Sequence, residues 1–457
     1  MGSQLKKRYG LFTAITMVVG IVIGSGVFFK AEKILTATGG NLPLGILAWI
    51  IGGIIMLVCA YTFSIMAGKY EFVNGVVDYA DVIVGKKYGY YIAWFLATIY
   101  YPAITSVLAW VSSRYFCVLL GFDIFGAECM IIAGFFMVAS FVMNAISPTL
   151  AGKFQVSTTV IKLIPLLLMA VVGLIVGLGN GMLVENFTSI PSTDISAGNA
   201  LFSSVVAAAF AFEGWIIATI INSELKDAKR NLPKALVIGT VIVMAVYILY
   251  YIGLAGAVPN AALMESGEAG TKLAFTTVFS NIGGTLLNVL VVISCLGTLN
   301  GLMVGSTRGF YAIAARGVGF APETFKQVDK KTGMPHNAAI LGLLFVSFWL
   351  LYFYGANLTT WFGPVRFDSS ELPIVALYAA YIPMFILFIK REKDLPFFQR
   401  FVAPILSICG SVFMVIAAIF AHGVSVAWFL AVFAVFMTVG VFFSKEQPDE
   451  PLKAKKH

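Results

Sequence analysis

Long apolar segments dominate this chain, and each is close to the ~20 residues that an α-helix needs to cross the hydrocarbon core of a bilayer. The runs are continuous, whereas strands of an outer-membrane barrel alternate apolar and polar residues. Only 11% of the 457 residues are charged, against about a quarter in soluble domains. The sequence therefore predicts an all-α integral membrane protein. We expect about twelve transmembrane helices, at 11–36, 43–68, 88–117, 126–145, 154–178, 198–222, 233–257, 280–312, 337–354, 370–390, 402–421 and 424–443.

Charges in the connecting loops indicate how these helices are oriented. With the N-terminus in the cytoplasm, the loops on that side carry the basic residues, as in "KDAKRNLPK" (226–234), while an opposite loop carries Glu265. This distribution obeys the positive-inside rule and predicts a multi-pass protein of the cell membrane with both termini cytoplasmic. The net charge of +8 comes from these loops, so no nucleic-acid partner is indicated. Asp78 and Asp81 lie in a partly apolar cytoplasmic loop, where we expect them to be solvated.

Motifs for enzymes and cofactors are missing from the sequence. The five cysteines are scattered and the three histidines are far apart, so neither a disulfide framework nor a metal site is indicated. We find no phosphate-binding loop, no HExxH and no GxSxG with partners. We therefore expect no cofactor and no enzymatic activity. Residues 1–445 are expected to form a single transmembrane domain, followed by a cytoplasmic tail at 446–457.

A cluster of small residues interrupts the first expected span. Gly20, Gly24, Ser25 and Gly26 occur together in "GIVIGSGVFFK" (20–30). Glycine disfavours a helix by about 1 kcal/mol relative to alanine, and a broken helix in lipid exposes backbone groups at several kcal/mol each. Either the small residues let another helix approach closely, or the break itself is functional.

The sixth span repeats this feature, with "FAFEGW" (210–215) at its centre. The first and sixth spans open two five-helix halves, 11–178 and 198–390, and two further helices follow at 402–443. Because the first half begins inside and has five spans, the second begins outside, so the two halves are inverted. Interrupted helices at corresponding positions of inverted repeats are the best sequence indication of a transporter binding site.

The chemistry of two opposed helix breaks suits a zwitterion. A half-helix that starts after Gly24-Ser25-Gly26 presents free N–H groups and the positive end of its dipole, which favour a carboxylate. A half-helix that ends near Phe210-Ala211 presents free carbonyls, which favour an ammonium group. The α-carboxylate and α-amine of an amino acid match this pair, and the small neighbours leave room for a modest side chain.

Three further residues stand out within the apolar spans. Lys162 costs about 2.5 to 3.5 kcal/mol if it is deep in the membrane; it either extends to the cytoplasmic interface or bonds to free carbonyls of the unwound first helix. Glu213 either supports the fold or takes part in substrate or proton coupling. Tyr247 could present its hydroxyl to the site.

With these segments the chain resembles the amino acid–polyamine–organocation superfamily, and within it the bacterial relatives of the L-type amino acid transporters. The motifs are "GIVIGSGVF", "FAFEGW", the Lys162 segment and "TLNGLMVGSTRGFYAIAARG" (298–317), and the resemblance covers nearly the whole chain. It implies a leucine-transporter-like fold, with five plus five helices in inverted repeat, two extra C-terminal helices, and helices 1 and 6 unwound at mid-membrane. It also implies that Lys162 fills the cation site of sodium-coupled relatives. The substrate-binding residues implied are Val22, Ile23, Gly24, Ser25, Gly26, Phe210, Ala211, Phe212, Glu213 and Gly214, with Phe210 and Tyr247 as possible gates.

The function expected from these residues and this resemblance is sodium-independent exchange of small neutral L-amino acids, such as alanine, serine or cysteine, by alternating access. Many L-type members have a small residue where Glu213 stands, while members that handle dibasic amino acids often have an acid. Proton-coupled or exchange transport of cationic amino acids or polyamines is therefore an alternative, and a non-transporting amino acid sensor is another. The expected partners are small-molecule substrates and membrane lipid, with no obligatory protein partner.

Overall fold

The computed structural model describes residues 10–70, 75–188, 196–215, 225–267, 269–330 and 332–444, and the regular structure in these ranges is helical. Among them, ten helices are long and apolar enough to cross a membrane, judged by length and composition. Two shorter apolar helices, Leu11–Gly20 and Ala197–Phe212, lie in the two spans that the sequence predicts to be broken. The all-α membrane architecture is thus confirmed. The ends of the chain and the second half of the sixth span, including 216–222 and the tail 446–457, lie outside the described residues.

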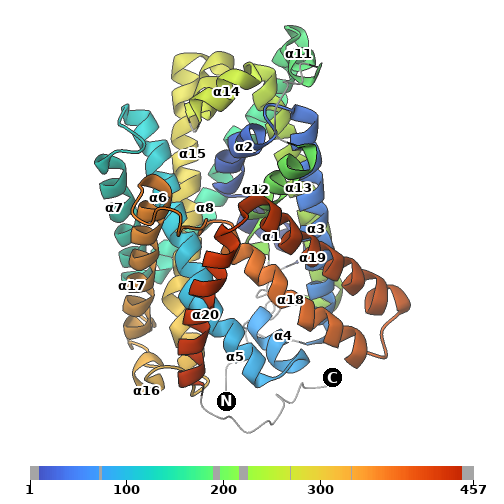
Figure 1. The fold of residues 1–457 in the computed structure, drawn as a ribbon, viewed down its shortest axis with the longest axis vertical. Helices are drawn as coiled ribbons and strands as arrows, with labels where there is room; N and C mark the ends of the chain where they lie inside the picture. The colour runs from blue at the N-terminus through green and yellow to red at the C-terminus, as the bar shows by residue number, and fades with distance from the viewer. Residues whose placement is uncertain are drawn as a thin grey trace.

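The helices follow one another in a compact bundle with little connecting chain (Figure 1). The helices of the first half are α1 Leu11–Val22, α2 Gly26–Ala37, α3 Leu42–Lys69, α4 Val76–Ile83, α5 Lys86–Phe95, α6 Tyr101–Leu120, α7 Ala127–Ile146, α8 Pro148–Ile161, α9 Leu163–Leu168, α10 Leu174–Gly179 and α11 Met182–Thr188. Those that follow are α12 Ala197–Phe212, α13 Ala228–Ala257, α14 Asn260–Ser266, α15 Ala269–Ala314, α16 Pro322–Phe325, α17 His336–Phe353, α18 Leu372–Arg391, α19 Ala403–His422 and α20 Ser425–Phe443.

Several expected spans consist of more than one helical segment. A π-helical turn at Leu96–Tyr100 joins α5 to α6, so the third span runs continuously from Lys86 to Leu120. A second π-helical turn, Met169–Gly173, joins α9 to α10 in the fifth span. α15 bends at Ser280, whose φ of 63° is not helical, and the eighth span begins at this bend, as the sequence predicts.

Two groups of helices pack against each other around the breaks. α13 packs along α3 and α1, and α12 packs against α2, α3 and α19. In the second group, α6 packs along α15, α7 and α17. Figure 1 shows α6, α7 and α17 on one side of the bundle and α3, α12 and α13 towards the other. The broken helices therefore belong to one group and face α6 and α15 of the other.

The first break occupies residues 23 to 25, between the end of α1 and the start of α2. Ile23 is extended, with φ −65° and ψ 113°, so the helix cannot continue through it. A Cβ atom at Gly26 would lie 2.6 Å from Cα of Ala211, in the other broken helix. The glycine thus serves both purposes that the sequence suggests, because it starts a new half-helix and lets the two breaks approach.

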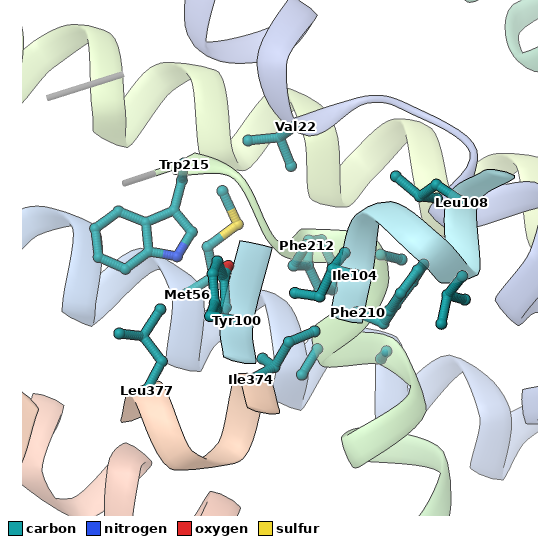
Figure 2. Close-up of a cluster of buried hydrophobic side chains, with 14 of the residues drawn as sticks. Val22, Met56, Tyr100, Ile104, Leu108, Phe210, Phe212, Trp215, Ile374 and Leu377 are labelled. Atoms are coloured by element: carbon teal, nitrogen blue, oxygen red, sulfur yellow. The ribbon is translucent and has the colours of Figure 1, made fainter. Parts of the chain in front are cut away.

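Apolar side chains pack around both breaks (Figure 2). Val22, Phe210 and Trp215 are buried there, and α6 contributes Ile104. The third span lies at the centre of the bundle and is almost entirely buried, whereas α20 is mostly exposed and lies at the periphery. Exposed apolar side chains on such peripheral helices are expected where lipid is the solvent.

The expectation of solvated acids in the loop after the second span is wrong. Asp78 and Asp81 lie on α4, and Asp78 is only 6% exposed. Arg316, just after α15, forms ion pairs with Asp78 and with Asp81; its Nη2 atom lies 3.3 Å from Asp81 Oδ2. Burial raises the pKa of Asp81 to about 6, although Arg316 opposes this shift. The loop folds back because its apolar residues form a short helix that carries both acids onto the arginine.

Candidate functional site

A cavity of about 250 Å³ lies between the two helix breaks. Polar groups reach it from both breaks and from α6, α8 and α15, while several of its walls are apolar. Its lining residues are Val22, Gly24, Ser25, Gly26, Tyr100, Tyr101, Ile104, Leu108, Gln155, Lys162, Phe210, Ala211, Glu213, Gly214, Thr298, Gly301, Leu302 and Val304.

One wall of the cavity is the N-terminus of α2, which starts at Gly26. The first N–H groups of a helix have no partner within it and carry the positive end of the helix dipole. The backbone N–H of Ser25 donates to Thr298 Oγ1 at 3.2 Å, which fixes the entry to the helix. The hydroxyl of Ser25 is buried and has no hydrogen-bond partner in the described part of the chain. A carboxylate placed here would meet backbone donors and a free hydroxyl.

The opposite wall consists of carbonyls at the ends of α1 and α12. Tyr247 Oη on α13 lies 3.0 Å from the carbonyl oxygens of both Val22 and Ala211. A hydroxyl carries one proton, so it can donate to only one of these carbonyls at a time. The other carbonyl keeps its capacity to accept a hydrogen bond from an ammonium group. The single tyrosine thus ties the two broken helices together while leaving acceptors between them.

Lys162 lies between α8 and α9 and is 1% exposed. Its Nζ donates to the carbonyl oxygen of Gly20 on α1 at 2.5 Å. The side chain therefore turns towards the broken helix and does not extend to the interface, which favours the second interpretation of this residue. An ammonium group has three donors, and one of them satisfies a carbonyl that α1 leaves unpaired near its end.

Glu213 directly follows the end of α12 and lines the cavity half-buried. The hydroxyl of Tyr100, in the π-helical turn before α6, donates to Glu213 Oε1 at 2.5 Å. The next residue, Gly214, has φ 105°, a conformation that glycine adopts without strain. The acid is thus fixed at the second break by one strong hydrogen bond.

Aromatic rings close the cavity on the side of α2. The ring of Phe210 meets that of Phe29 edge-on, with centroids 5.9 Å apart, and Phe29 in turn meets Trp110 at 6.0 Å. Nζ of Lys30 lies 4.7 Å from the centroid of the Phe210 ring. We call the side of α2 the outer side, following the orientation expected from the loop charges. Phe210 thus stands between the cavity and the outer side, where a gate would act.

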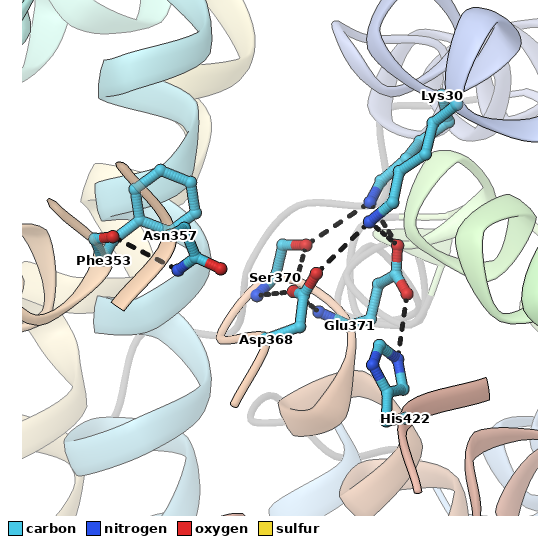
Figure 3. A network of polar contacts seen from close by, with 8 residues as sticks. Lys30, Phe353, Asn357, Asp368, Ser370, Glu371 and His422 are labelled. Atoms are coloured by element: carbon cyan, nitrogen blue, oxygen red, sulfur yellow. Dashed lines mark hydrogen bonds and ion pairs between the residues drawn. The ribbon is translucent and has the colours of Figure 1, made fainter. Parts of the chain in front are cut away.

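An ionic network lies on the outer side of these aromatic rings and joins α2, the start of α18 and the end of α19 (Figure 3). Fully buried Lys30 donates to Glu371 Oε1 at 2.6 Å, and Lys33 donates to the same oxygen at 2.7 Å. His422 Nε2 lies 3.1 Å from Glu371 Oε2, and Lys33 also pairs with Asp368. We call these five residues the outer ionic network. The sequence analysis did not predict this network. A signal was present, because these charged residues lie near the outer ends of their spans, whereas most other charges lie in the cytoplasmic loops.

The structure brings most of the predicted residues together, at one cavity. Ile23, Phe212 and Tyr247 are exceptions, because all three are fully buried and none of them lines it. Phe212 instead packs its ring against Trp49 and Tyr247. The sequence reasoning did not find the lining residues on α6, α8 and α15, because a single tyrosine, threonine or glutamine in an apolar helix gives no distinct pattern. These missed polar residues are Tyr100, Tyr101, Gln155 and Thr298.

Comparisons with known proteins agree with this architecture. The chain is 29% identical to the serine/threonine exchanger SteT of Bacillus subtilis, and the match covers 90% of each protein. It is 23% identical to the human b(0,+)-type amino acid transporter 1 over 91% of this chain and 83% of that protein. With the human large neutral amino acids transporter small subunit 2 it shares 26% identity, over 69% of this chain and 59% of the relative.

Among solved structures, MhsT in complex with L-phenylalanine matches with a TM-score of 0.58 at 17% identity, covering 92% of this chain and 100% of that one. At this identity the likeness concerns the fold alone, and it supports the leucine-transporter-like fold that the sequence resemblance implies. The sequence profile of the amino acid permease family matches residues 9–443, which is nearly the whole chain. This chain therefore belongs to the amino acid permease family, a family of transporters and not of enzymes.

Proposed function

We propose that this protein is a sodium-independent exchanger of small neutral L-amino acids, such as alanine, serine or cysteine. The observation that carries the proposal is the pairing of chemistries across one cavity. The start of α2 with the free hydroxyl of Ser25 stands on one side, and the carbonyls of Val22 and Ala211 stand on the other. The first wall suits a carboxylate and the second an ammonium group, so an α-amino acid matches both.

The size of the cavity supports a small substrate. Its volume of about 250 Å³ lies below the ~300–1,000 Å³ of sites for drug-sized ligands. The apolar residues Ile104, Leu108 and Leu302 offer no countercharge to a charged side chain. The name of SteT, a serine/threonine exchanger, supports both the substrate class and exchange as the mode of transport.

Sodium independence is proposed from the position of Lys162. Its ammonium group bonds to the Gly20 carbonyl in the unwound first span, where a bound cation would otherwise neutralise free carbonyls. The ammonium group of Lys162 would then take the place of a sodium ion at this carbonyl. We place the protein in the cell membrane with both termini cytoplasmic, acting without an obligatory protein partner. Residues 11–178 and 198–390 are proposed to be the inverted halves that rock during alternating access.

Reconstitution into liposomes tests this proposal. The purified protein is expected to take up labelled alanine and serine when the vesicles contain unlabelled amino acid, and to do so equally in sodium and in potassium buffers. Uptake that strictly requires a sodium gradient, or that ignores internal amino acid, would contradict it. A protein that binds amino acid in detergent but moves none in vesicles would be the sensor alternative.

Glu213 supports a second candidate, transport of a cationic amino acid or polyamine with this carboxylate as the charge partner. The observation that favours it is the carboxylate in the cavity wall, held by Tyr100. Labelled arginine and putrescine distinguish the two candidates. If the second is right, wild-type protein carries these cations and Glu213→Gln abolishes their uptake; uptake of the cation that survives the substitution rejects it.

A further inference from the structure

A chain of buried amides runs from the interior of the bundle to the wall of the cavity. Asn144 on α7 donates from Nδ2 to Asn300 Oδ1 on α15 at 2.8 Å. Asn300 donates from its own Nδ2 to Gln155 Oε1 on α8 at 3.3 Å. Asn144 and Asn300 are only 3% and 1% exposed, whereas Gln155 lines the cavity. Three helices thus hold one glutamine in place, and this glutamine belongs neither to the carboxylate wall nor to the ammonium wall.

Backbone carbonyls fix which way each amide points. Asn144 Nδ2 also donates to the carbonyl of Ser140 at 2.9 Å, and Asn300 Nδ2 to the carbonyl of Ala151 at 3.2 Å. A carbonyl can only accept, so each asparagine must turn its NH2 group towards it. Asn300 therefore presents a donor to Gln155, and Gln155 must accept this hydrogen bond with its Oε1 atom. The NH2 group of Gln155 is left without a hydrogen-bond partner in the described part of the chain.

The NH2 group of Gln155 lies on the cavity side of the fifth span, beside α15. Gln155 and Lys162 are seven residues apart, so they share one face of the fifth span, about 10 Å apart along its axis. Gly301 of α15 packs directly against the amide, since a Cβ there would lie 3.3 Å from Gln155 Oε1. The hydroxyl of Thr298 on α15 already donates to the Ser294 carbonyl and accepts from the backbone N–H of Ser25.

We propose that Gln155 is a specificity-determining residue, whose oriented NH2 group donates a hydrogen bond to an acceptor oxygen in the side chain of the substrate. Asn300 is its positioning residue. The site then prefers hydroxylated amino acids to apolar ones of similar size, because a substrate that lacks the oxygen leaves this donor without a hydrogen-bond partner on the substrate. The inference rests on the proposed transport of small amino acids and adds to it which side chains are selected.

Competition in proteoliposomes tests the proposal. Unlabelled serine and alanine, and separately threonine and valine, compete with labelled serine for uptake by wild-type protein and by Gln155→Met. The methionine keeps the length of the side chain and removes the donor. We expect wild-type protein to prefer the hydroxylated member of each pair, and the ratio of the two inhibition constants to fall about 3- to 10-fold in Gln155→Met, the range expected for one hydrogen bond.

A second variant separates positioning from general damage. Asn300→Leu leaves Gln155 in place but frees its amide to rotate, so the same ratio should fall by a smaller factor. Val156→Leu is the matched control, because Val156 is the next residue on α8 and is 70% exposed on the far side from the cavity; its ratio should equal that of wild type. If Gln155→Met does not transport, binding is measured in detergent instead. The shifts in melting temperature caused by serine and by alanine then show whether the preference for the hydroxylated amino acid has fallen.

Two results would overturn the inference. One is a wild-type protein that does not favour the hydroxylated amino acid of either pair. The other is a ratio that stays the same in Gln155→Met and Asn300→Leu. Both leave the proposed function intact, because they concern the ratio and not the uptake itself. A wild-type protein that takes up no amino acid overturns the proposed function, and this inference with it.

Discussion

In the part of the chain that the structure describes, two lysines are buried within the membrane bundle, and their surroundings differ. Lys30 is fully buried on α2 and meets the carboxylate of Glu371, whereas Lys162 is 1% exposed and meets the backbone carbonyl of Gly20. The first lysine ties α2 to the start of α18, where Glu371 in turn contacts His422 at the end of α19. The second neutralises partial charges inside one broken helix. A buried lysine can therefore join two segments through a carboxylate, or compensate an unpaired backbone carbonyl of a neighbouring span, and its partner decides which.

The difference has an energetic consequence. A full ion pair such as Lys30–Glu371 loses about 3 to 5 kcal/mol when one partner is removed, because a buried charge is left uncompensated. A hydrogen bond from a charged donor to a carbonyl contributes about 1.5 to 3 kcal/mol. Substitutions in the two places should therefore differ in size and also in kind. Those near Lys30 should alter stability and outer closure, and those near Lys162 should alter transport.

The largest effect is expected from Glu371→Leu, which leaves Lys30 without its carboxylate. We expect destabilisation of about 3 to 5 kcal/mol, seen as a lower melting temperature of the detergent-solubilised protein. The double variant Lys30→Met/Glu371→Leu should recover most of the loss, since an apolar pair can replace a buried ion pair. Glu323→Gln is the control, because this acid is 81% exposed in a surface pair. Equal melting temperatures for Glu371→Leu and wild type would show that the outer ionic network does not hold the structure closed.

Lys162→Met is expected to reduce exchange of the labelled amino acid about 10- to 100-fold, the loss that corresponds to a charged hydrogen bond. The physical reason is that the Gly20 carbonyl loses its donor and the end of α1 its fixed geometry. The initial rate of uptake into proteoliposomes measures it. Lys153→Met, an exposed lysine of the same helix, is the matched control. Undiminished exchange by Lys162→Met would mean that the ammonium group is a structural feature only.

Tyr247→Phe removes a hydroxyl that reaches both breaks and keeps the ring in its packing. One neutral hydrogen bond contributes about 0.5 to 1.5 kcal/mol, so we expect the apparent affinity for substrate to fall about 3- to 10-fold. The change should appear in KM of uptake more than in melting temperature. A variant with unchanged KM but lower stability would place the tyrosine in the scaffold and not in the site.

The smallest effect concerns pH at the outer ionic network. Burial alone would raise the pKa of Asp368, but the ammonium groups of Lys33 and Lys30 outweigh it and lower this pKa to about 2. The stabilisation from Asp368 is therefore complete above about pH 4 and is lost only as the pH falls towards 2. The network also contains His422, and histidine is the side chain that commonly changes charge between pH 5 and 8.

Protonated His422 would add a third cation beside Glu371, attracted by that carboxylate and by Asp368 and repelled by Lys33. We expect the attraction to dominate at 3.1 Å, so the outer side should close more firmly at pH 5.5 and exchange should slow about twofold. His422→Gln keeps a donor and should flatten this pH dependence. A pH profile of uptake that is the same in wild type and His422→Gln would show that the histidine does not control closure of the outer side.

Part of the site was predictable because its residues are unusual in their local setting. Lys162 stands out in an apolar span, and the glycines at 24 and 26 stand out because membrane helices lose free energy at such a break. Lys30 occurs in the same stretch but is near the end of the span, where a lysine can reach water, so its burial was not predictable. Gln155 is an ordinary polar residue in sequence and gains its role only through Asn300, which is far away along the chain.

The sequence by itself determined that the chain is a bundle of membrane helices, because the lengths of apolar runs and the charges of loops are local properties set by the bilayer. It also predicted the positions of both breaks and a zwitterion site at their ends, since free backbone groups follow from where a helix stops. Only the tertiary structure decided which groups complete the site. Contacts such as those of Tyr247 with two helices, of Lys30 with Glu371 and of Asn300 with Gln155 join residues far apart in the chain. These contacts are strong because packed helices surround them with a medium of low polarity, and no single segment provides that medium by itself.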